Sequence, residues 1–183
     1  KREVAIILLV RADSQRQAEN KVNKLLDLSL SAHERLKILK CSLIEERLGL
    51  SLDEYEILRQ NTTHIIHAAA STKFTLPLEE ARRNNVLTTK RLLSFAEDCN
   101  SLRRFGFVST AFVAGKRSGV ILEDEFEHKA GFLNTYEESK YEAELVVRSM
   151  INILPIVIFR PSLILTPYKK SSISPVSALT LGL

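Results

Sequence analysis

Cysteine is scarce in this chain of 183 residues, and its placement excludes several classes of protein. The two cysteines, Cys41 and Cys99, lie far apart and form no C-x-x-C pair, so a disulfide framework is not indicated. A reducing compartment suits such a chain, and we expect a cytoplasmic location. His64 and His67 stand in an apolar stretch without a nearby cysteine or carboxylate, so we expect no metal site.

The chain also lacks a hydrophobic run long enough to cross a membrane. Its apolar N-terminal segment is Val4–Val10, far shorter than the roughly 20 residues that a spanning helix needs. Arg11 follows this segment directly, and the small-residue cleavage site of a signal peptide is missing. Because the segment is β-branched and apolar on both faces, we interpret it as a buried parallel strand in a chain truncated ahead of Lys1.

Charge of one sign is in only mild excess. The formal net charge is +4, and the basic residues are scattered without interleaved aromatics, so a nucleic-acid partner is not indicated. With 45% hydrophobic and 26% charged residues, the chain has the composition of an ordinary globular domain. We expect one domain over residues 1–166, with residues 167–183 starting a substrate-binding region or forming a disordered tail.

Glycine is the most informative shortage. None of the six glycines supplies the G-x-G-x-x-G turn with which a dinucleotide fold brings pyrophosphate to a helix N-terminus. Either the chain is not a dinucleotide fold, or the first strand and helix of that fold lie upstream of Lys1.

Apolar segments of strand length alternate with amphipathic segments of helix length along the whole chain. This alternation predicts a parallel sheet with right-handed crossovers, in a doubly wound α/β fold. Ser51 and Glu54 have the spacing of a capping box, which predicts a short helix after Ser51. We expect strands at 4–10, 36–41, 64–69, 105–109 and 156–160, and longer helices at 13–29, 77–98 and 134–150.

Tyr136 and Lys140 are the first candidates for chemistry. Positions four apart share one face of a helix, so the lysine can lower the pKa of the phenol and make it a usable acid or base. The alternative for this pair alone is a solvated face of glutamates and lysines with one aromatic anchor.

Ser109 and Thr110 end a predicted strand, where ligands collect in parallel sheets. Their alternative is a local hydroxyl-to-backbone turn.

Two further features fit a dinucleotide. Ala68–Ala70 follow a predicted strand and leave room for a flat ligand, although tight helix packing would explain them equally well. Arg11 follows the first strand, where an arginine can bind a ribose 2′-phosphate and favour NADP. The alternative is an ordinary surface arginine.

The order of these motifs resembles the extended short-chain dehydrogenase/reductase superfamily, and its thioester-reductase and fatty acyl-CoA reductase-like branch. The resemblance extends over nearly the whole chain. It rests on seven segments in order: Leu9-Val10-Arg11-Ala12, Arg47-Leu48-Gly49-Leu50-Ser51, His67-Ala68-Ala69-Ala70, Asn85-Val86, Ser109-Thr110-Ala111, Tyr136-x-x-x-Lys140 and Arg160-Pro161-Ser162.

The resemblance implies a Rossmann-like domain and a role for each matching position. Thr110 would polarise a substrate carbonyl, Tyr136 would protonate it, and Lys140 would bind the nicotinamide ribose and tune Tyr136. The other implied contacts with the cofactor run from Arg11 and Lys21 at the 2′-phosphate, through Ser42 and Leu43 at the adenine and Ala68, Ala69 and Ala70 beside the adenosine, to Asn85, Ser109, Pro161 and Ser162 toward the nicotinamide.

The chain departs from the family pattern at several places. Cys41-Ser42 stand where the family has Gly-Asp, and Thr88 stands where it has glycine. The first βα unit with its glycine-rich loop and most of the substrate-binding region are absent. Without a central strand, residues 4–10 must pair directly with 64–69 or leave backbone groups unpaired. We therefore expect this chain to bind NADP poorly or not at all.

The resemblance implies an NADP-dependent reductase that converts an acyl thioester, bound to coenzyme A or to a carrier, into an aldehyde or alcohol. One alternative is an extended dehydrogenase or epimerase acting on a nucleotide sugar or sterol. Another is a non-catalytic remnant or cofactor-sensing module, favoured by Cys41-Ser42 and Thr88 and opposed by Thr110, Tyr136 and Lys140. Oligomerisation through helices on the sheet is compatible with all three.

Overall fold

The computed structural model describes residues 5–25 and 35–164 of the chain. These residues belong to two compact units, one formed by Lys1–Lys40 with Ser162–Leu183 and the other by Cys41–Pro161. Each unit is described by itself. The predicted domain boundary at residue 166 stays a prediction, and residues 167–183 lie outside the described part.

The first unit contains the predicted strand, helix and strand. Strand β1 (Ile6–Arg11) pairs with β2 (Leu36–Cys41), and helix α1 (Gln15–Leu25) connects them. The side-chain amide of Gln15 holds the start of α1 to β2, because its Nε2 donates to the Ile38 carbonyl at 2.8 Å and its Oε1 accepts from the Lys40 amide at 2.9 Å. Ala18 and Val22 are buried as the helical period predicts. The predicted extension of α1 through residue 29 lies outside the described residues.

One prediction for the first strand is wrong. Ile6 and Ile7 are 53% and 38% exposed, although the apolar pattern predicts burial on both faces. A sheet of two strands with one helix has too few neighbours to cover both sides. The described strands form two sheets, β1-β2 in this unit and β3-β4-β5 in the other, where β3 spans His64–His67.

The second unit is built on a parallel sheet, as predicted. β3 pairs with β4 (Arg104–Val108), and β4 pairs with β5 (Ile156–Phe159), both in parallel. β4 lies in the middle, and its Phe105 and Phe107 are almost completely buried. The carboxyl ends of the three strands therefore lie along one edge of this sheet.

One long helical segment runs from Leu78 to Asp98. It consists of α4 (Leu78–Arg82), a π-helical turn η2 (Arg83–Leu87) and α5 (Thr88–Asp98). Its start after Pro77 follows the sequence prediction. The π-helical turn was not predicted, and it carries Asn85, which is only 2% exposed. Such turns arise where tertiary contacts favour a locally widened helix, often at functional sites.

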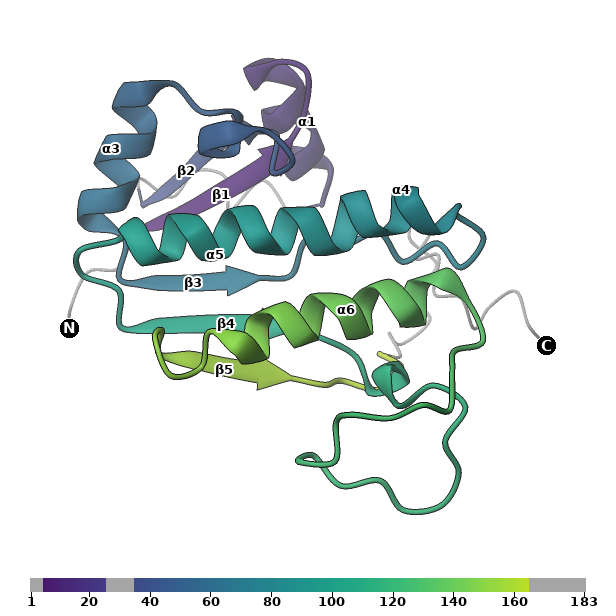
Figure 1. The fold of residues 1–183 in the computed structure, drawn as a ribbon. Coiled ribbons are helices and arrows are strands. Elements are labelled where there is room, and N and C mark those ends of the chain that lie inside the picture. The colour runs from purple at the N-terminus through teal and green to yellow at the C-terminus, as the bar shows by residue number, and fades with distance from the viewer. Residues whose placement is uncertain (1–4, 26–34, 165–183) are drawn as a thin grey trace. The chain divides into compact units, whose positions relative to one another are not determined.

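Helix α6 (Thr135–Ser149) begins where predicted and is capped by Asn134, whose side chain accepts from the Glu137 amide. Figure 1 shows α6 running beside α4 and α5 along the sheet β3-β4-β5. An ion pair at 2.6 Å between Arg82 of α4 and Glu142 of α6 joins the two helices. Ala143 and Val147 are fully buried, so this face of α6 packs in the core.

A compact segment follows β2 at the start of the second unit. The short helix η1 (Glu46–Gly49) contains three consecutive residues with positive φ, Arg47, Leu48 and Gly49. Ser51 then caps α3 (Leu52–Asn61), and Glu54 completes the predicted capping box. No helix in the described parts of the chain is both long and apolar enough to cross a membrane.

Candidate active site

Thr110 lies just beyond the carboxyl end of β4. Its Oγ1 accepts a hydrogen bond from the Phe112 amide at 3.3 Å and so caps the short helix η3 (Ala111–Ala114). The same side chain lies close enough to Tyr136 to lower the pKa of its phenol, and Thr110 is 4% exposed. The local hydroxyl-to-backbone turn that the sequence offered as the alternative is therefore present. The role of Thr110 at a substrate carbonyl stays a prediction.

Lys140 lies one helical turn after Tyr136 and is buried, with 3% of its surface exposed. Its Nζ donates to the Val108 carbonyl at 2.8 Å and lies 4.4 Å from the centre of the Phe107 ring. A solvated charged face is thus excluded for this residue. Burial lowers the pKa of Lys140 to about 8, and the charge of Glu144 opposes that shift.

The expected lowering of the Tyr136 pKa by Lys140 is wrong for this structure. Burial raises the pKa of Tyr136, and the hydrogen bond with Thr110 opposes the rise. The reason is geometric, since the ammonium of Lys140 is directed at β4. A raised pKa keeps the phenol protonated at neutral pH, which suits a proton donor.

Asn85 connects this centre to the segment after β3. Its Nδ2 donates to the hydroxyl of Ser139 at 2.9 Å and to the Ser71 carbonyl at 3.1 Å, and its Oδ1 accepts from the Ser71 amide at 2.7 Å. Ser139 in turn donates to the Tyr136 carbonyl at 3.0 Å. The π-helical turn therefore anchors both the loop after β3 and the first turns of α6. Thr88, one of the departures, fits this helix because its hydroxyl donates to the Asn84 carbonyl at 2.7 Å.

His67 was discounted as a metal ligand, and sequence reasoning missed its place beside the centre. Thr89 donates its only hydroxyl proton to the Asn85 carbonyl at 2.6 Å, so toward His67 Nε2, at 3.0 Å, it acts as acceptor. Nε2 therefore carries the ring proton, and Nδ1 is a buried acceptor with no hydrogen-bond partner among the described residues. Burial, and secondarily the charge of Lys140, lower the pKa of His67 to about 4.

Glu144 is a second residue that sequence reasoning missed. Its carboxylate is fully buried and accepts from Ser109 Oγ at 2.5 Å, from Arg160 Nε at 3.0 Å and from Arg148 Nε at 3.0 Å. The available signal was a glutamate four residues after Lys140, on the same helical face. The predicted role of Ser109 beside the cofactor stays a prediction.

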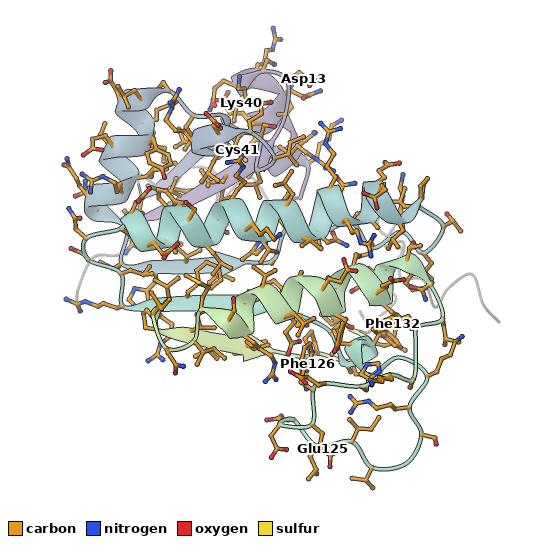
Figure 2. All side chains as sticks on the ribbon, in the orientation of Figure 1. Asp13, Lys40, Cys41, Glu125, Phe126 and Phe132 are labelled. Carbon is orange, nitrogen blue, oxygen red and sulfur yellow. The ribbon has the colours of Figure 1, made fainter. Side chains whose placement is uncertain are left out.

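An aromatic cluster anchors the loop between η3 and α6. Phe126 stacks on Tyr141 with ring centroids 4.5 Å apart, and Phe132 lies 5.1 Å from the same tyrosine. Arg148 and Arg160 lie over the Phe126 ring at 4.4 and 5.1 Å. Figure 2 shows Phe126 and Phe132 close to α6 and η3, whereas Glu125 lies out on the loop.

The remaining predicted cofactor contacts are exposed or half-buried. Ala68–Ala70 follow the end of β3 and are exposed, so tight helix packing does not explain them. Ser42, Leu43 and Pro161 are half-buried in the second unit, and Ser162 is exposed and groups with the first.

Arg11 and Lys21 belong to the first unit. Both are exposed, and Lys21 Nζ donates to the Arg11 carbonyl at 2.7 Å. The ammonium of Lys21 in α1 therefore lies at the backbone of Arg11, the last residue of β1.

The described residues contain no group of three or more histidines, cysteines or acids that could hold a metal ion. Cys41 and Cys99 are buried free thiols.

A parallel α/β fold with a hydroxyl at a strand end and a tyrosine and lysine one helical turn apart defines a Rossmann-type domain of the extended short-chain dehydrogenase/reductase class. Residues 1–180 match the NAD-binding family described as "Male sterility protein". The chain belongs to this family and constitutes an NAD(P)-binding domain.

Curated relatives of the chain include fatty acyl-CoA reductases. Fatty acyl-CoA reductase wat of Drosophila melanogaster is 31% identical over 148 residues, which cover 67% of this chain and 29% of that protein. Fatty acyl-CoA reductase 1 of Mus musculus is 26% identical and is matched by 91% of this chain. The chain spans only 29% and 39% of the lengths of these two relatives.

Solved structures of Rossmann-type domains are similar to this chain as well. The terminal R domain from the myxalamid PKS-NRPS biosynthetic pathway is similar with a TM-score of 0.76 and 30% identity, over 86% of this chain and 42% of that chain. A UDP-glucuronic acid 4-epimerase from Bacillus cereus in complex with NAD is similar with a TM-score of 0.58 and 25% identity, over 73% of this chain and 41% of that one.

The residues of the second unit fit the nicotinamide half of a dinucleotide. An ammonium has three donors, and the buried Lys140 has a carbonyl acceptor for one of them, at Val108. Hydroxyls of a ribose could accept the others. The exposed Ala68–Ala70 leave space at the end of β3 for a flat ligand.

Proposed function

We propose that the protein is an NADP-dependent reductase of acyl thioesters, carried by coenzyme A or by a carrier domain. The observation that carries this proposal is the cluster of Thr110, Tyr136 and Lys140 at the ends of β4 and α6. The relatives named as fatty acyl-CoA reductases and the R domain from a PKS-NRPS pathway support the choice of substrate. Buried free thiols agree with a cytoplasmic location.

In the proposed mechanism Thr110 and Tyr136 hold the carbonyl oxygen of the substrate by two hydrogen bonds. The bound nicotinamide supplies a hydride to the carbonyl carbon. Tyr136, kept protonated by its raised pKa, gives its hydroxyl proton to the oxygen. The hemithioacetal formed from a thioester then breaks its carbon–sulfur bond and releases a thiol and an aldehyde. Lys140 would hold the nicotinamide ribose.

The Tyr136→Phe variant tests this role in the full-length protein. We expect kcat for NADPH oxidation with acyl-CoA to fall by about 100-fold to 10,000-fold, the usual contribution of a general acid. Binding of NADPH, measured by calorimetry, should remain unchanged. Tyr141→Phe is the matched control, because it removes a hydroxyl from the next tyrosine of the same helix and should retain activity. Full turnover by Tyr136→Phe would refute the assignment.

A preference for NADP over NAD is part of the proposal and rests on Arg11 and Lys21. Charge-assisted hydrogen bonds to a phosphate contribute about 1.5–3 kcal/mol. Arg11→Ala in the full-length protein should therefore weaken NADPH binding by about tenfold to a hundredfold while leaving NADH binding unchanged. Arg16→Ala removes another exposed arginine from α1 and should change neither. Equal losses for both cofactors would contradict the role of Arg11.

A second candidate is an extended epimerase or dehydrogenase that acts on a nucleotide sugar. The similarity to a UDP-glucuronic acid 4-epimerase favours it. A screen of the full-length protein separates the two: consumption of NADPH with acyl thioesters supports the reductase, and conversion of UDP-sugars with bound NAD supports the epimerase.

A further inference from the structure

The carboxylate of Glu144 is the most completely buried charge in the described part of the second unit. None of the residue is exposed. Burial raises the pKa of Glu144, but hydrogen bonds from Arg160, Ser109 and Arg148 outweigh it and hold the pKa below its ordinary value. An ionised carboxylate in such a place requires donors on every side.

The donors come from three elements that meet at the active site. Arg160 follows β5 and reaches both oxygens of Glu144 through Nε, at 3.0 and 3.1 Å. Arg148 lies one turn further along α6 and donates to Oε1 at 3.0 Å. Ser109 follows β4 and donates to Oε2 at 2.5 Å. Glu144 thus ties the ends of β4 and β5 to α6.

Ser109 directly precedes Thr110, so its position decides where the threonine hydroxyl lies. The Ser109 amide donates to the Phe159 carbonyl at 2.7 Å, and its side chain is held by Glu144. Glu144 and Tyr136 lie two helical turns apart on α6. We propose that Glu144 is a positioning residue. Its buried carboxylate holds Ser109 and Arg160 in place, so that Thr110 stays next to Tyr136. The same carboxylate balances the charge of Lys140.

The charge balance at Lys140 involves groups from every neighbouring element. The Val108 carbonyl and the Phe107 ring of β4 contact the ammonium. His67 of β3 is neutral and interacts with the same charge. Glu144 is the acid that raises the pKa of Lys140 against burial, and it is shared with Arg148 and Arg160. Loss of its charge should therefore leave Lys140 less protonated at neutral pH.

This proposal rests on the proposed reductase activity for its kinetic test. In the full-length protein, Glu144→Gln should lower kcat by about 10-fold or more, because small misplacements of reacting groups are costly, with the Kd for NADPH unchanged. Glu144→Asp, which keeps the charge, should restore part of kcat. Glu142→Gln removes a carboxylate from the same helix, where it pairs with Arg82, and should keep normal kcat. Normal kcat in Glu144→Gln would overturn the proposal.

Ser109→Ala keeps every charge and provides a second test in case Glu144→Gln does not fold. It removes only the link from the carboxylate to β4. We expect a reduced kcat with unchanged NADPH binding, and a crystal structure in which Thr110 has moved away from the Tyr136 hydroxyl. A normal kcat, or an unmoved Thr110, would overturn the positioning role.

A measurement without substrate tests the role of Glu144 independently of the proposed reductase activity. Lysine labelled with ¹³C at Cε reports the titration of Lys140 by NMR, and the signal is assigned by its loss in Lys140→Met. The pKa should fall below its value of about 8 in Glu144→Gln and stay near it in Glu142→Gln. If the protein reduces no thioester, this titration still decides the role of Glu144, since an unchanged pKa would overturn it.

Discussion

His67 shows how one buried side chain makes stability depend on pH. Its pKa is lowered from 6.5 to about 4, chiefly by burial, so the folded state keeps the ring neutral where the unfolded chain is protonated. The unfolded state therefore binds more protons between about pH 4 and 6.5, and stability falls as the pH drops through this window. At its largest the loss is about 3 kcal/mol.

Urea unfolding of His67→Gln at pH 7 and pH 5 tests this dependence. The variant should lose less stability between the two pH values than the parent does. His64→Gln changes an exposed histidine of the same strand and should follow the parent. If the free energy of unfolding falls equally between pH 7 and pH 5 in His67→Gln and in the parent, another group causes the pH dependence.

The sequence predicted the candidate catalytic side chains but not the residues that hold them in place. Tyr136, Lys140 and Thr110 occur in a recognisable order, and the structure places them together. Glu144 could not be selected, because it is one of several glutamates on α6 and only tertiary packing buries it. His67 was equally hidden, since its role depends on Thr89 and Asn85 from a helix distant in sequence.

Among the elements, the predicted strands and helices are largely confirmed, with ends that differ by a few residues. β2 spans Leu36–Cys41 as predicted, and α6 spans Thr135–Ser149. The π-helical turn at Arg83–Leu87 escaped prediction because its cause is the tertiary anchoring of Asn85 and not a local pattern. The left-handed run in η1 escaped because Arg47 and Leu48 rarely adopt that conformation.

Gly49 makes the turn of η1 possible. Its φ is +67°, and a Cβ would lie 2.9 Å from the backbone nitrogen of Ser42. Gly49→Ala therefore combines a strained backbone, which costs about 1–2 kcal/mol, with a steric clash. Gly119 also has a positive φ, of +85°, but nothing lies within 4 Å of its Cβ position. Gly119→Ala isolates the backbone cost, so we expect chemical denaturation to show a larger destabilisation for Gly49→Ala.

For the molecule as a whole, the 183-residue chain should bind NADPH weakly. It contains the candidate contacts for the 2′-phosphate and the nicotinamide, but no G-x-G-x-x-G turn for the pyrophosphate. Calorimetry on this chain should give little heat with NADPH, whereas the full-length protein should bind it. A Kd of about 1 μM or tighter for the chain alone would contradict this expectation.

The parallel architecture was predictable at this scale because strand-length and helix-length segments alternate along the chain. The division into two sheets was not, since strand pairing depends on contacts between distant segments. β1 pairs with β2 within the first unit, and Ile6 is 53% exposed because little covers its face of this two-stranded sheet.

The parallel order of β3, β4 and β5 has a consequence for how the chain folds. Each parallel pair requires a long crossover, so His67, Thr110 and Arg160 approach one another only after segments distant in sequence have docked. No local segment of the chain can form the active-site arrangement by itself. We expect the site to form late and cooperatively in folding. Local opening of any one of the three strands should disrupt the site before the rest of the unit unfolds.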